Sequence, residues 1–342
     1  MERPTTSSKN EFLDADLDAD LDADLGTESP SKPPAETAEA AVREDKKGTT
    51  RRRALRAFGK LGLGAAFGGA AALSSPLTAY AQDGPTLDGP AGILNFALAL
   101  EYLEATYYQM GLDSGVVEGD DADAVYSLIT EHEEEHVAVL QAAIEDAGAT
   151  PIPADAVNFD FTGRQGDDSA DPMFQPFQNY GTFLLLSQAF EDTGVRAYKG
   201  QAPNIPADLN LAGLNVLTAA LQIHALEGRH AAEVRRLRAM YLNSEGQMAA
   251  DGDLEPWIDE DDDTDGSPVA PVYDGEGNVT QPASGDLATD LSSALSGDYT
   301  DEQIAESFDE PLAMGDVLAI ANLFVEEDLE AFFGTDDGNG GG

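Results

Sequence analysis

Two Glu-x-x-His motifs are the parts of this sequence best suited to chemistry: Glu133 with His136, and Glu227 with His230. On a helix, positions i and i+3 share one face, so each motif can offer a carboxylate and an imidazole to a common centre. Both motifs fall on apolar stripes that should be buried, and a buried carboxylate is costly unless something compensates its charge. A cation in the core would do so, and the motifs therefore predict a metal site.

An internal repeat supplies the remaining ligands. Glu101 precedes Tyr108 by seven residues, and Glu191 precedes Tyr198 by seven. Two helical turns separate each pair, so each Tyr is expected on the face of its Glu. The second Glu–Tyr pair follows the first by 90 residues, and the second Glu-x-x-His motif follows the first by 94. Four helices are thus predicted to contribute six metal ligands: Glu101, Glu133, His136, Glu191, Glu227 and His230.

Three further residues are predicted to lie beside these ligands. Tyr108 and Tyr198 are expected to be core tyrosines whose hydroxyls bond ligand carboxylates, rather than redox-active groups. Glu104 also falls on the inner stripe of its helix, but its counterpart in the repeat is Gly194. We therefore expect Glu104 to support the site and not to be one of its repeated ligands.

Two other histidines complete the set of four in the chain. His132 is adjacent to Glu133 and is expected to point away from the site. His224 precedes Glu227 by three residues and could face inward, so it is a minor ligand candidate.

The donor set limits the chemistry. The chain has no Cys, which excludes disulfides and thiolate sites. Carboxylate and imidazole ligands suit two divalent ions of iron or manganese, whereas zinc usually takes fewer carboxylates. Glu101 and Glu191 would be terminal ligands and Glu133 and Glu227 bridging ligands, with one His on each metal.

Such a site predicts oxidation of metal or consumption of oxygen or peroxide. A metal-stabilised structural protein without turnover, and an empty site with partly protonated carboxylates, remain as alternatives.

Four segments with a helical apolar period must position these residues. Their predicted ranges are about 92–110, 121–147, 176–199 and 208–242. Short Gly- and Pro-containing connections join the first to the second and the third to the fourth, while the longer run 148–175 joins the second to the third. Two helical hairpins with one long crossover predict an all-α, ferritin-like four-helix bundle over residues 89–242.

Several motifs resemble a known family, the ferritin-like domain family that includes plant desiccation-related proteins. The similar stretches are Leu94–Leu98, Glu101–Glu104, Phe190–Asp192, Ala197–Tyr198, Glu227–His230 and Asp309–Leu312. The resemblance covers about residues 90–242 and 308–325 and implies the fold and the two-metal site, with a stress-protective role. It does not specify a reaction, because the activities of members are often unknown.

The flanking segments have other compositions. Residues 1–48 form an acidic leader with a repeated Leu-Asp-Ala-Asp, expected to be disordered. Residues 49–81 contain Arg51 and Arg52, an apolar run and Ala79-Tyr80-Ala81, the plan of a twin-arginine export signal. A membrane anchor or basic linker is the alternative reading, and export to the cell surface or beyond is the expectation.

Two segments follow the predicted bundle. Residues 243–307 are acidic and rich in Gly and Pro, and we expect a solvated insertion. Residues 308–334 become helical in pattern again and are expected to pack on the bundle. These additions would crowd the surfaces used for cage assembly, so iron storage in a cage is not expected, while a smaller homo-oligomer is left open.

Charge limits the partners. The chain has a net charge of −47, and residues 82–342 hold 7 basic and 52 acidic residues. This surface would repel phosphate backbones and anionic lipid, which argues against nucleic acid and membrane-surface partners. No stable membrane span is expected after residue 81. Self-repulsion on this scale predicts adaptation to high salt, which screens it.

Overall fold

A computed structural model of the chain describes residues 89–246, 257–258, 268–281, 289–295, 299–326, 329 and 333. The predicted acidic leader (1–48) and export signal (49–81) lie outside the described residues, as do much of the insertion and the end of the chain. The account below concerns the described residues.

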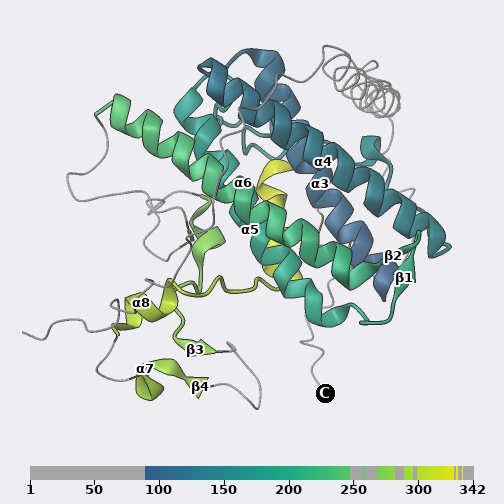
Figure 1. Ribbon diagram of the computed structural model, residues 1–342. Helices are drawn as coiled ribbons and strands as arrows, with labels where there is room; N and C mark the ends of the chain where they lie inside the picture. Colours follow the sequence, from purple (N-terminus) through teal and green to yellow (C-terminus); the bar gives the residue numbers. More distant parts are fainter. Residues whose placement is uncertain are drawn as a thin grey trace, which may run out of the picture. The chain divides into compact units, whose positions relative to one another are not determined.

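Four long helices dominate the fold and confirm the predicted all-α bundle (Figure 1). Their bounds are α3 Pro90–Ser114, α4 Asp120–Asp146, α5 Tyr180–Gln201 and α6 Val216–Ser244. Pro90 begins α3, where its missing N–H costs nothing, and Gly115 ends it in a left-handed conformation. Three aspartates in the first turn of α4 complement the positive end of the helix dipole.

The helices pair as two hairpins, α3 with α4 and α5 with α6, and further contacts join α3 to α5 and α4 to α6. The long crossover between α4 and α5 contains the short 3-10 helix η1 (Ala154–Ala156). Side chains of α3 hold this crossover in place. The Ile152 N–H donates to the Asn95 side chain (2.9 Å), and the Tyr102 hydroxyl donates to the Ile152 carbonyl (3.1 Å). This arrangement is the predicted connectivity of a ferritin-like bundle.

Two predicted helix starts are wrong. The fourth helix begins at Val216 rather than at residue 208, because a small hairpin of β1 (Asn210–Leu211) and β2 (Leu214–Asn215) precedes it. Ala212 and Gly213, at the tip, both have positive φ, which a helix does not allow. The third helix begins at Tyr180 rather than at residue 176, because a capping side chain from Asn179 accepts the Thr182 N–H.

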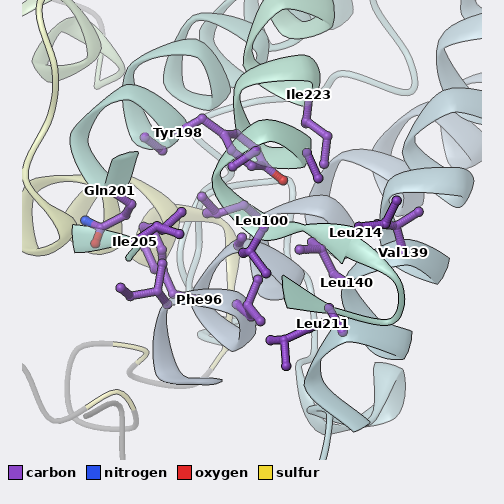
Figure 2. A pocket seen from close by; sticks show the side chains of 18 residues that line it. Phe96, Leu100, Val139, Leu140, Tyr198, Gln201, Ile205, Leu211, Leu214 and Ile223 are labelled. Carbon is purple, nitrogen blue, oxygen red and sulfur yellow. The ribbon is translucent and has the colours of Figure 1, made fainter. Parts of the chain in front are cut away.

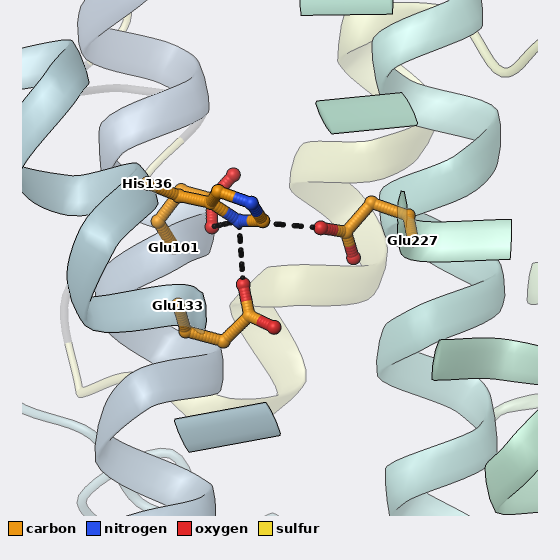
Figure 3. Close-up of side chains that lie close together, drawn as sticks. All are labelled: Glu101, Glu133, His136 and Glu227. Carbon is orange, nitrogen blue, oxygen red and sulfur yellow. Dashed lines mark hydrogen bonds and ion pairs between the residues drawn. The ribbon is translucent and has the colours of Figure 1, made fainter. Parts of the chain in front are cut away.

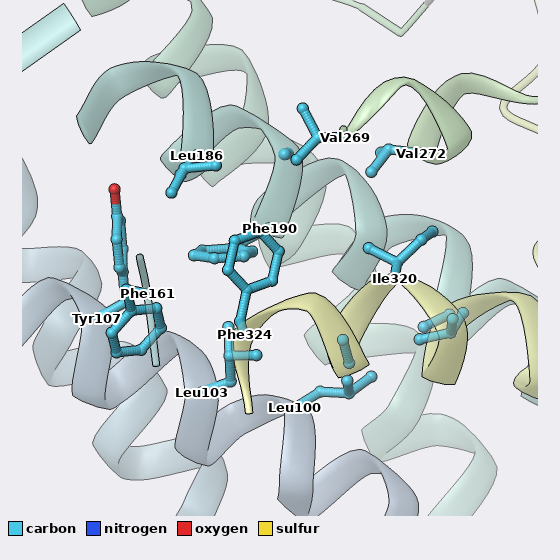
Figure 4. Close-up of a cluster of buried hydrophobic side chains, with 14 of the residues drawn as sticks. Leu100, Leu103, Tyr107, Phe161, Leu186, Phe190, Val269, Val272, Ile320 and Phe324 are labelled. Carbon is cyan, nitrogen blue, oxygen red and sulfur yellow. The ribbon is translucent and has the colours of Figure 1, made fainter. Parts of the chain in front are cut away.

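The C-terminal part packs on the bundle through α9 (Met314–Ala321) and the 3-10 turn η4 (Asn322–Phe324). Figure 4 shows Phe324 and Ile320 of this part beside Phe190 of α5 and Leu100 of α3. The Phe190 and Phe324 rings meet edge to face with centroids 4.8 Å apart. The backbone at Leu312 also lies directly against α5, where its N–H donates to the Arg196 carbonyl. The Leu312 carbonyl oxygen would lie only 2.0 Å from a Cβ at Gly200. Only Gly therefore fits at residue 200.

The described part of the insertion is not wholly solvated, contrary to expectation. The 3-10 helix η3 (Ala270–Tyr273) buries Val272 and Tyr273 in the main core. The buried guanidinium of Arg196 contacts the Glu276 carboxylate at 2.7 Å and donates to the Asp274 carbonyl at 2.7 Å. This charged contact holds the segment against α5.

Smaller elements complete the described chain. They are η2 (Ala202–Asn204), β3 (Thr280–Gln281), β4 (Thr289–Asp290), α7 (Leu291–Ala294) and α8 (Asp301–Ala305). Within the described residues, no helix combines the length and the apolar character needed to cross a membrane.

Candidate metal centre

The structure brings the six predicted ligands together at the centre of the bundle. α3 contributes Glu101, α5 contributes Glu191, and α4 and α6 each contribute one Glu-x-x-His motif. All four carboxylates are fully buried, and the two imidazoles are nearly so. Their ligand atoms form two groups of four that share Glu133 and Glu227.

The first group surrounds the His136 ring, as Figure 3 shows. Its Nδ1 lies 3.1 Å from Oε2 of Glu101, 2.8 Å from Oε2 of Glu133 and 3.4 Å from Oε1 of Glu227. Glu101 and His136 come from one helical hairpin and Glu227 from the other. The group therefore exists only when both hairpins are docked.

The second group surrounds His230. Its Nδ1 lies 3.0 Å from Oε1 of Glu133 and 3.4 Å from Oε2 of Glu191. Glu133 thus offers one oxygen to each histidine, Oε2 to His136 and Oε1 to His230. A carboxylate in that position can bridge two ions held by the two groups.

The donor atoms fit metal ions better than they fit one another. Among the described residues, Glu191 Oε2 and both oxygens of Glu227 are buried and form no hydrogen bond. Glu133 Oε1 and His230 Nδ1 lie 3.0 Å apart and contact each other as an ion pair. In an octahedral site with bonds of about 2.1 Å, neighbouring ligand atoms lie about 3.0 Å apart. The distances from His136 Nδ1 to the carboxylate oxygens around it run from 2.8 to 3.4 Å and bracket this value. Buried acidic and imidazole groups in this arrangement could bind metal ions.

Without metal, protons must offset the buried charge. Burial raises the pKa of Glu101 to about 7, although His136 opposes the shift. Burial also raises the pKa of Glu227 well above its usual value, and the neighbouring carboxylates add to this. Burial would likewise raise the pKa of Glu133, but hydrogen bonds from His136 and His230 outweigh it and hold that pKa at about 2.

The pKa values of the two histidines are raised, whereas the pKa of an ordinary buried imidazole is lowered. Burial lowers the pKa of His136, but the Glu101 and Glu133 carboxylates more than compensate and bring it to about 10. The pKa of His230 also rises to about 10 against the effect of burial, because of Glu191 and Glu133. Both imidazoles therefore carry protons at neutral pH, which a metal would have to displace.

The two tyrosines bond carboxylates, each on the opposite helix. The Tyr108 hydroxyl of α3 donates to Glu191 of α5 (2.6 Å), and the Tyr198 hydroxyl of α5 donates to Glu101 of α3. The hydroxyls bond carboxylates of the cluster, as predicted, and each bond crosses between the halves of the repeat.

Glu104 lies in the core beside the cluster and is 4% exposed. Burial raises its pKa well above the usual value, and the nearby Glu191 and Glu133 raise it further. A Cβ at Gly194 would lie 3.0 Å from Glu227 Oε2 and 3.3 Å from Glu104 Oε1. Because Gly194 has no side chain, it leaves room for the carboxyl groups of Glu227 and Glu104.

The expectation that His132 points away from the site is wrong. Its Nδ1 lies 2.9 Å from Nε2 of His230, and the two rings stack with centroids 5.2 Å apart. The sequence held the signal, because His132 precedes His136 by four residues and so shares its face. His224 is not part of either group: its Nδ1 lies 3.0 Å from the Val195 carbonyl oxygen.

A buried ion pair beside the cluster was missed from the sequence. Asp192, adjacent to Glu191, contacts Nη2 of Arg235 at 2.5 Å and accepts a hydrogen bond from the Tyr273 hydroxyl (3.0 Å). The pair joins α5 to α6 next to the Glu191 carboxylate. Its partners lie 43 residues apart, too far for local spacing to reveal.

Comparison with known proteins agrees with this geometry. Residues 89–240 match the family model of the ferritin-like domain, a range that begins just before α3 and ends within α6. No curated protein and no solved structure matches the chain.

Proposed function

We propose that this ferritin-like bundle holds two divalent ions of iron or manganese and uses them to oxidise metal or to consume oxygen or peroxide. The single observation that carries the proposal is the pair of four-residue groups sharing Glu133 and Glu227. Their unpartnered buried oxygens support it, because such atoms are rare in folded proteins without a ligand or water.

Charge supports a pair of ions rather than one. The six side chains include four carboxylates, and two divalent ions would neutralise them without protons. A single ion would leave two carboxylate charges that bound protons would have to offset, because an uncompensated buried charge is costly. In this arrangement Glu133 and Glu227 bridge, Glu101 and His136 complete one position, and Glu191 and His230 complete the other.

Other side chains of the bundle would orient these ligands. The hydroxyls of Tyr108 and Tyr198 hold one oxygen of Glu191 and Glu101, respectively, and leave the second oxygen of each carboxylate for a metal. His132 holds the outer nitrogen of His230. Iron or manganese, when bound, would supply the electrons for reaction with oxygen or peroxide. Burial, with Glu191 and Glu133 nearby, raises the pKa of Glu104 well above its usual value and so favours a proton on this side chain next to that chemistry.

A second candidate is a metal-stabilised structural protein without turnover, in a desiccation or other stress role. The observation that favours it is that the ligands come from all four helices, so that bound ions would join both hairpins. Binding energy of this kind contributes directly to folding.

One experiment separates the candidates. Metal content of the protein purified from its native host should be two ions per chain, and ferrous iron or manganese should then drive consumption of oxygen or peroxide. Two ions without turnover would favour the structural role, and no bound metal would overturn both. Glu135→Ala is a suitable control because Glu135 lies on α4 beside the motif but is exposed.

We further propose that the protein is exported through the twin-arginine route and works at high salt. Arg51 and Arg52 support the first proposal, and the 52 acidic residues against 7 basic ones after residue 81 support the second. Replacing both arginines by Lys should abolish export in the native host.

Lowering the salt concentration from about 1 M to about 0.1 M should unfold the protein, because the Debye length grows from about 3 Å to about 10 Å and screening of the acidic surface weakens. Unchanged helical circular dichroism would contradict salt adaptation.

A further inference from the structure

An apolar cavity of about 40 Å³ lies among the helices of the bundle, and Figure 2 shows the residues that line it. Residues of all four helices line it, and Leu211 and Leu214 of the β1–β2 hairpin close its outer end. Leu214 is 43% exposed, so this part of the wall borders solvent.

Helical spacing places the cavity one turn from the ligands. Its wall includes Ala97, four residues before Glu101, and Ile223, four residues before Glu227. Four residues of helix rise about 6 Å. Tyr198 connects the two sites directly, since it lines the cavity and its hydroxyl bonds Glu101.

Small side chains leave this space empty. Alanines occupy inner positions of the wall on all four helices, at Ala97, Ala143, Ala197 and Ala220. The opposite side of the ligand layer is filled instead by aromatic rings, with Tyr126 and Phe183 centroids 4.8 Å apart. A small molecule would therefore meet less obstruction from the hairpin end.

The size and polarity of the cavity select its occupant. Sites for drug-sized ligands measure about 300 Å³ or more, so only a molecule of a few atoms fits. Water or peroxide needs two or more polar partners in a cavity. The polar residues of the wall are Tyr198 and Gln201. The Tyr198 hydroxyl donates its proton to Glu101 and the Gln201 oxygen accepts from Asn204, so the Gln201 NH2 group is the side-chain donor left to the cavity. The remaining wall is apolar, which suits an uncharged, apolar diatomic gas.

We propose that this cavity is a holding site for dioxygen on its way to the metal centre. The inference rests on the proposed function and makes it more specific: oxygen, rather than peroxide, is the oxidant that the bundle is built to collect. Ala97, Ala143 and Ala220 set the capacity of the site by leaving it unfilled.

Xenon, an apolar atom, tests the site without any reaction. Crystals of the metal-loaded protein under xenon pressure should show one xenon peak among Ala97, Leu140 and Ile223. Ala220→Leu should remove the peak, and Leu140→Ala should increase its occupancy. Ala225→Leu is the matched control, because Ala225 is an exposed residue of the same helix, outside the cavity wall.

Kinetics then test the role in oxygen supply. In Ala220→Leu, or in the milder Ala143→Val if the first variant folds poorly, the oxygen concentration for half-maximal oxidation of ferrous iron should rise several-fold. Peroxide-driven oxidation by the same variant should be unchanged. Both rates should be unchanged in Ala225→Leu.

Failure of this inference is distinguishable from failure of the proposed function. No xenon peak in the unsubstituted protein, or ordered water in the cavity, would overturn the holding site and leave the metal centre intact. Xenon binding with an unchanged oxygen dependence in Ala220→Leu would overturn its role in supply. A protein that binds two ions but consumes no oxygen would overturn both the inference and the proposed oxidation by oxygen.

Discussion

Tyr108 on α3 donates a 2.6 Å hydrogen bond to Glu191 on α5, and Tyr198 on α5 returns the same contact to Glu101 on α3. Each half of the internal repeat therefore orients a carboxylate of the other half. The two bonds cross between non-consecutive helices, so they couple the docking of the hairpins to the geometry of the candidate ligands.

Removal of one of these hydroxyls should weaken one of the two metal positions. Tyr108→Phe frees the Glu191 carboxylate, and losses of outer-sphere partners typically reduce metal affinity by about 10- to 100-fold. Calorimetric titration with manganese should therefore show one weakened step out of two. Tyr107→Phe is the control, because the Tyr107 hydroxyl donates to the Phe183 carbonyl (2.9 Å) and not to the cluster. Equal losses in both variants would contradict the assignment.

Bridging and terminal ligands should differ in stoichiometry. Glu133 belongs to both groups, so Glu133→Ala should lose both ions, whereas Glu101→Ala should lose only the ion near His136. Metal analysis by mass spectrometry after dialysis gives the ions bound per chain. The exposed variant Glu135→Ala should keep its full content. If Glu133→Ala retained both ions, the shared position of this carboxylate would have no role in binding.

His132 should matter to metal binding although it is outside both groups. Its ring holds Nε2 of His230, so His132→Ala should lower the affinity of the position near His230 by about 10-fold or more. His224→Ala removes a histidine bonded to the Val195 carbonyl and should leave the affinity unchanged. Competition with a coloured chelator measures both; an unaffected His132→Ala protein would show that the contact is incidental.

Two helical glycines should respond differently to a methyl group. A Cβ at Gly194 would press against Glu227 and Glu104, whereas a Cβ at Gly228 would meet nothing within 4 Å. Gly228→Ala should stabilise the protein by about 0.5 to 1 kcal/mol through helix propensity. Gly194→Ala should gain less, and should weaken metal binding by displacing Glu227. Urea unfolding and metal titration of both variants check this, and identical behaviour of the pair would count against a crowded site.

Metal should protect the protein more as the pH rises. In the metal-free protein, His136 and His230 have pKa values of about 10, above the ordinary 6.5, so their stabilisation is complete below pH 6.5 and is lost as the pH rises through 10. Glu101, raised from 4.5 to about 7, loses its contribution as the pH rises from 4.5 through 7. Bound ions replace these protons, so the loaded protein should avoid the loss.

Thermal unfolding at fixed salt measures this difference. The gap in Tm between loaded and metal-free protein should widen from pH 5 to pH 9 by several degrees, since one pKa unit corresponds to about 1.4 kcal/mol. Below pH 4.5 the metal-free protein should weaken again as Glu133 is protonated, because its pKa is lowered to about 2. A constant gap across this range would mean that metal does not displace the protons of the cluster.

The sequence by itself determined the four helices, their connectivity and the six acid and imidazole side chains that meet at the centre. These are local properties: the apolar period fixes which face of a helix is buried, and the i, i+3 spacing of Glu133 and His136 fixes what that face presents. The repeated Glu–Tyr spacing, at Glu101 and again at Glu191, identified the two helices that supply the other carboxylates of the site. The family resemblance agreed with this over the bundle.

Tertiary structure decided which side chains of different helices contact one another. Spacing alone could not reveal that Tyr108 bonds Glu191, or that part of the insertion is buried through Tyr273. It also could not reveal a cavity, which depends on what four separate alanine positions leave unfilled. The physical reason is that sequence period sets the rotation of a side chain about its own helix axis, whereas the offset and separation of neighbouring helices are set by the packing of the whole core.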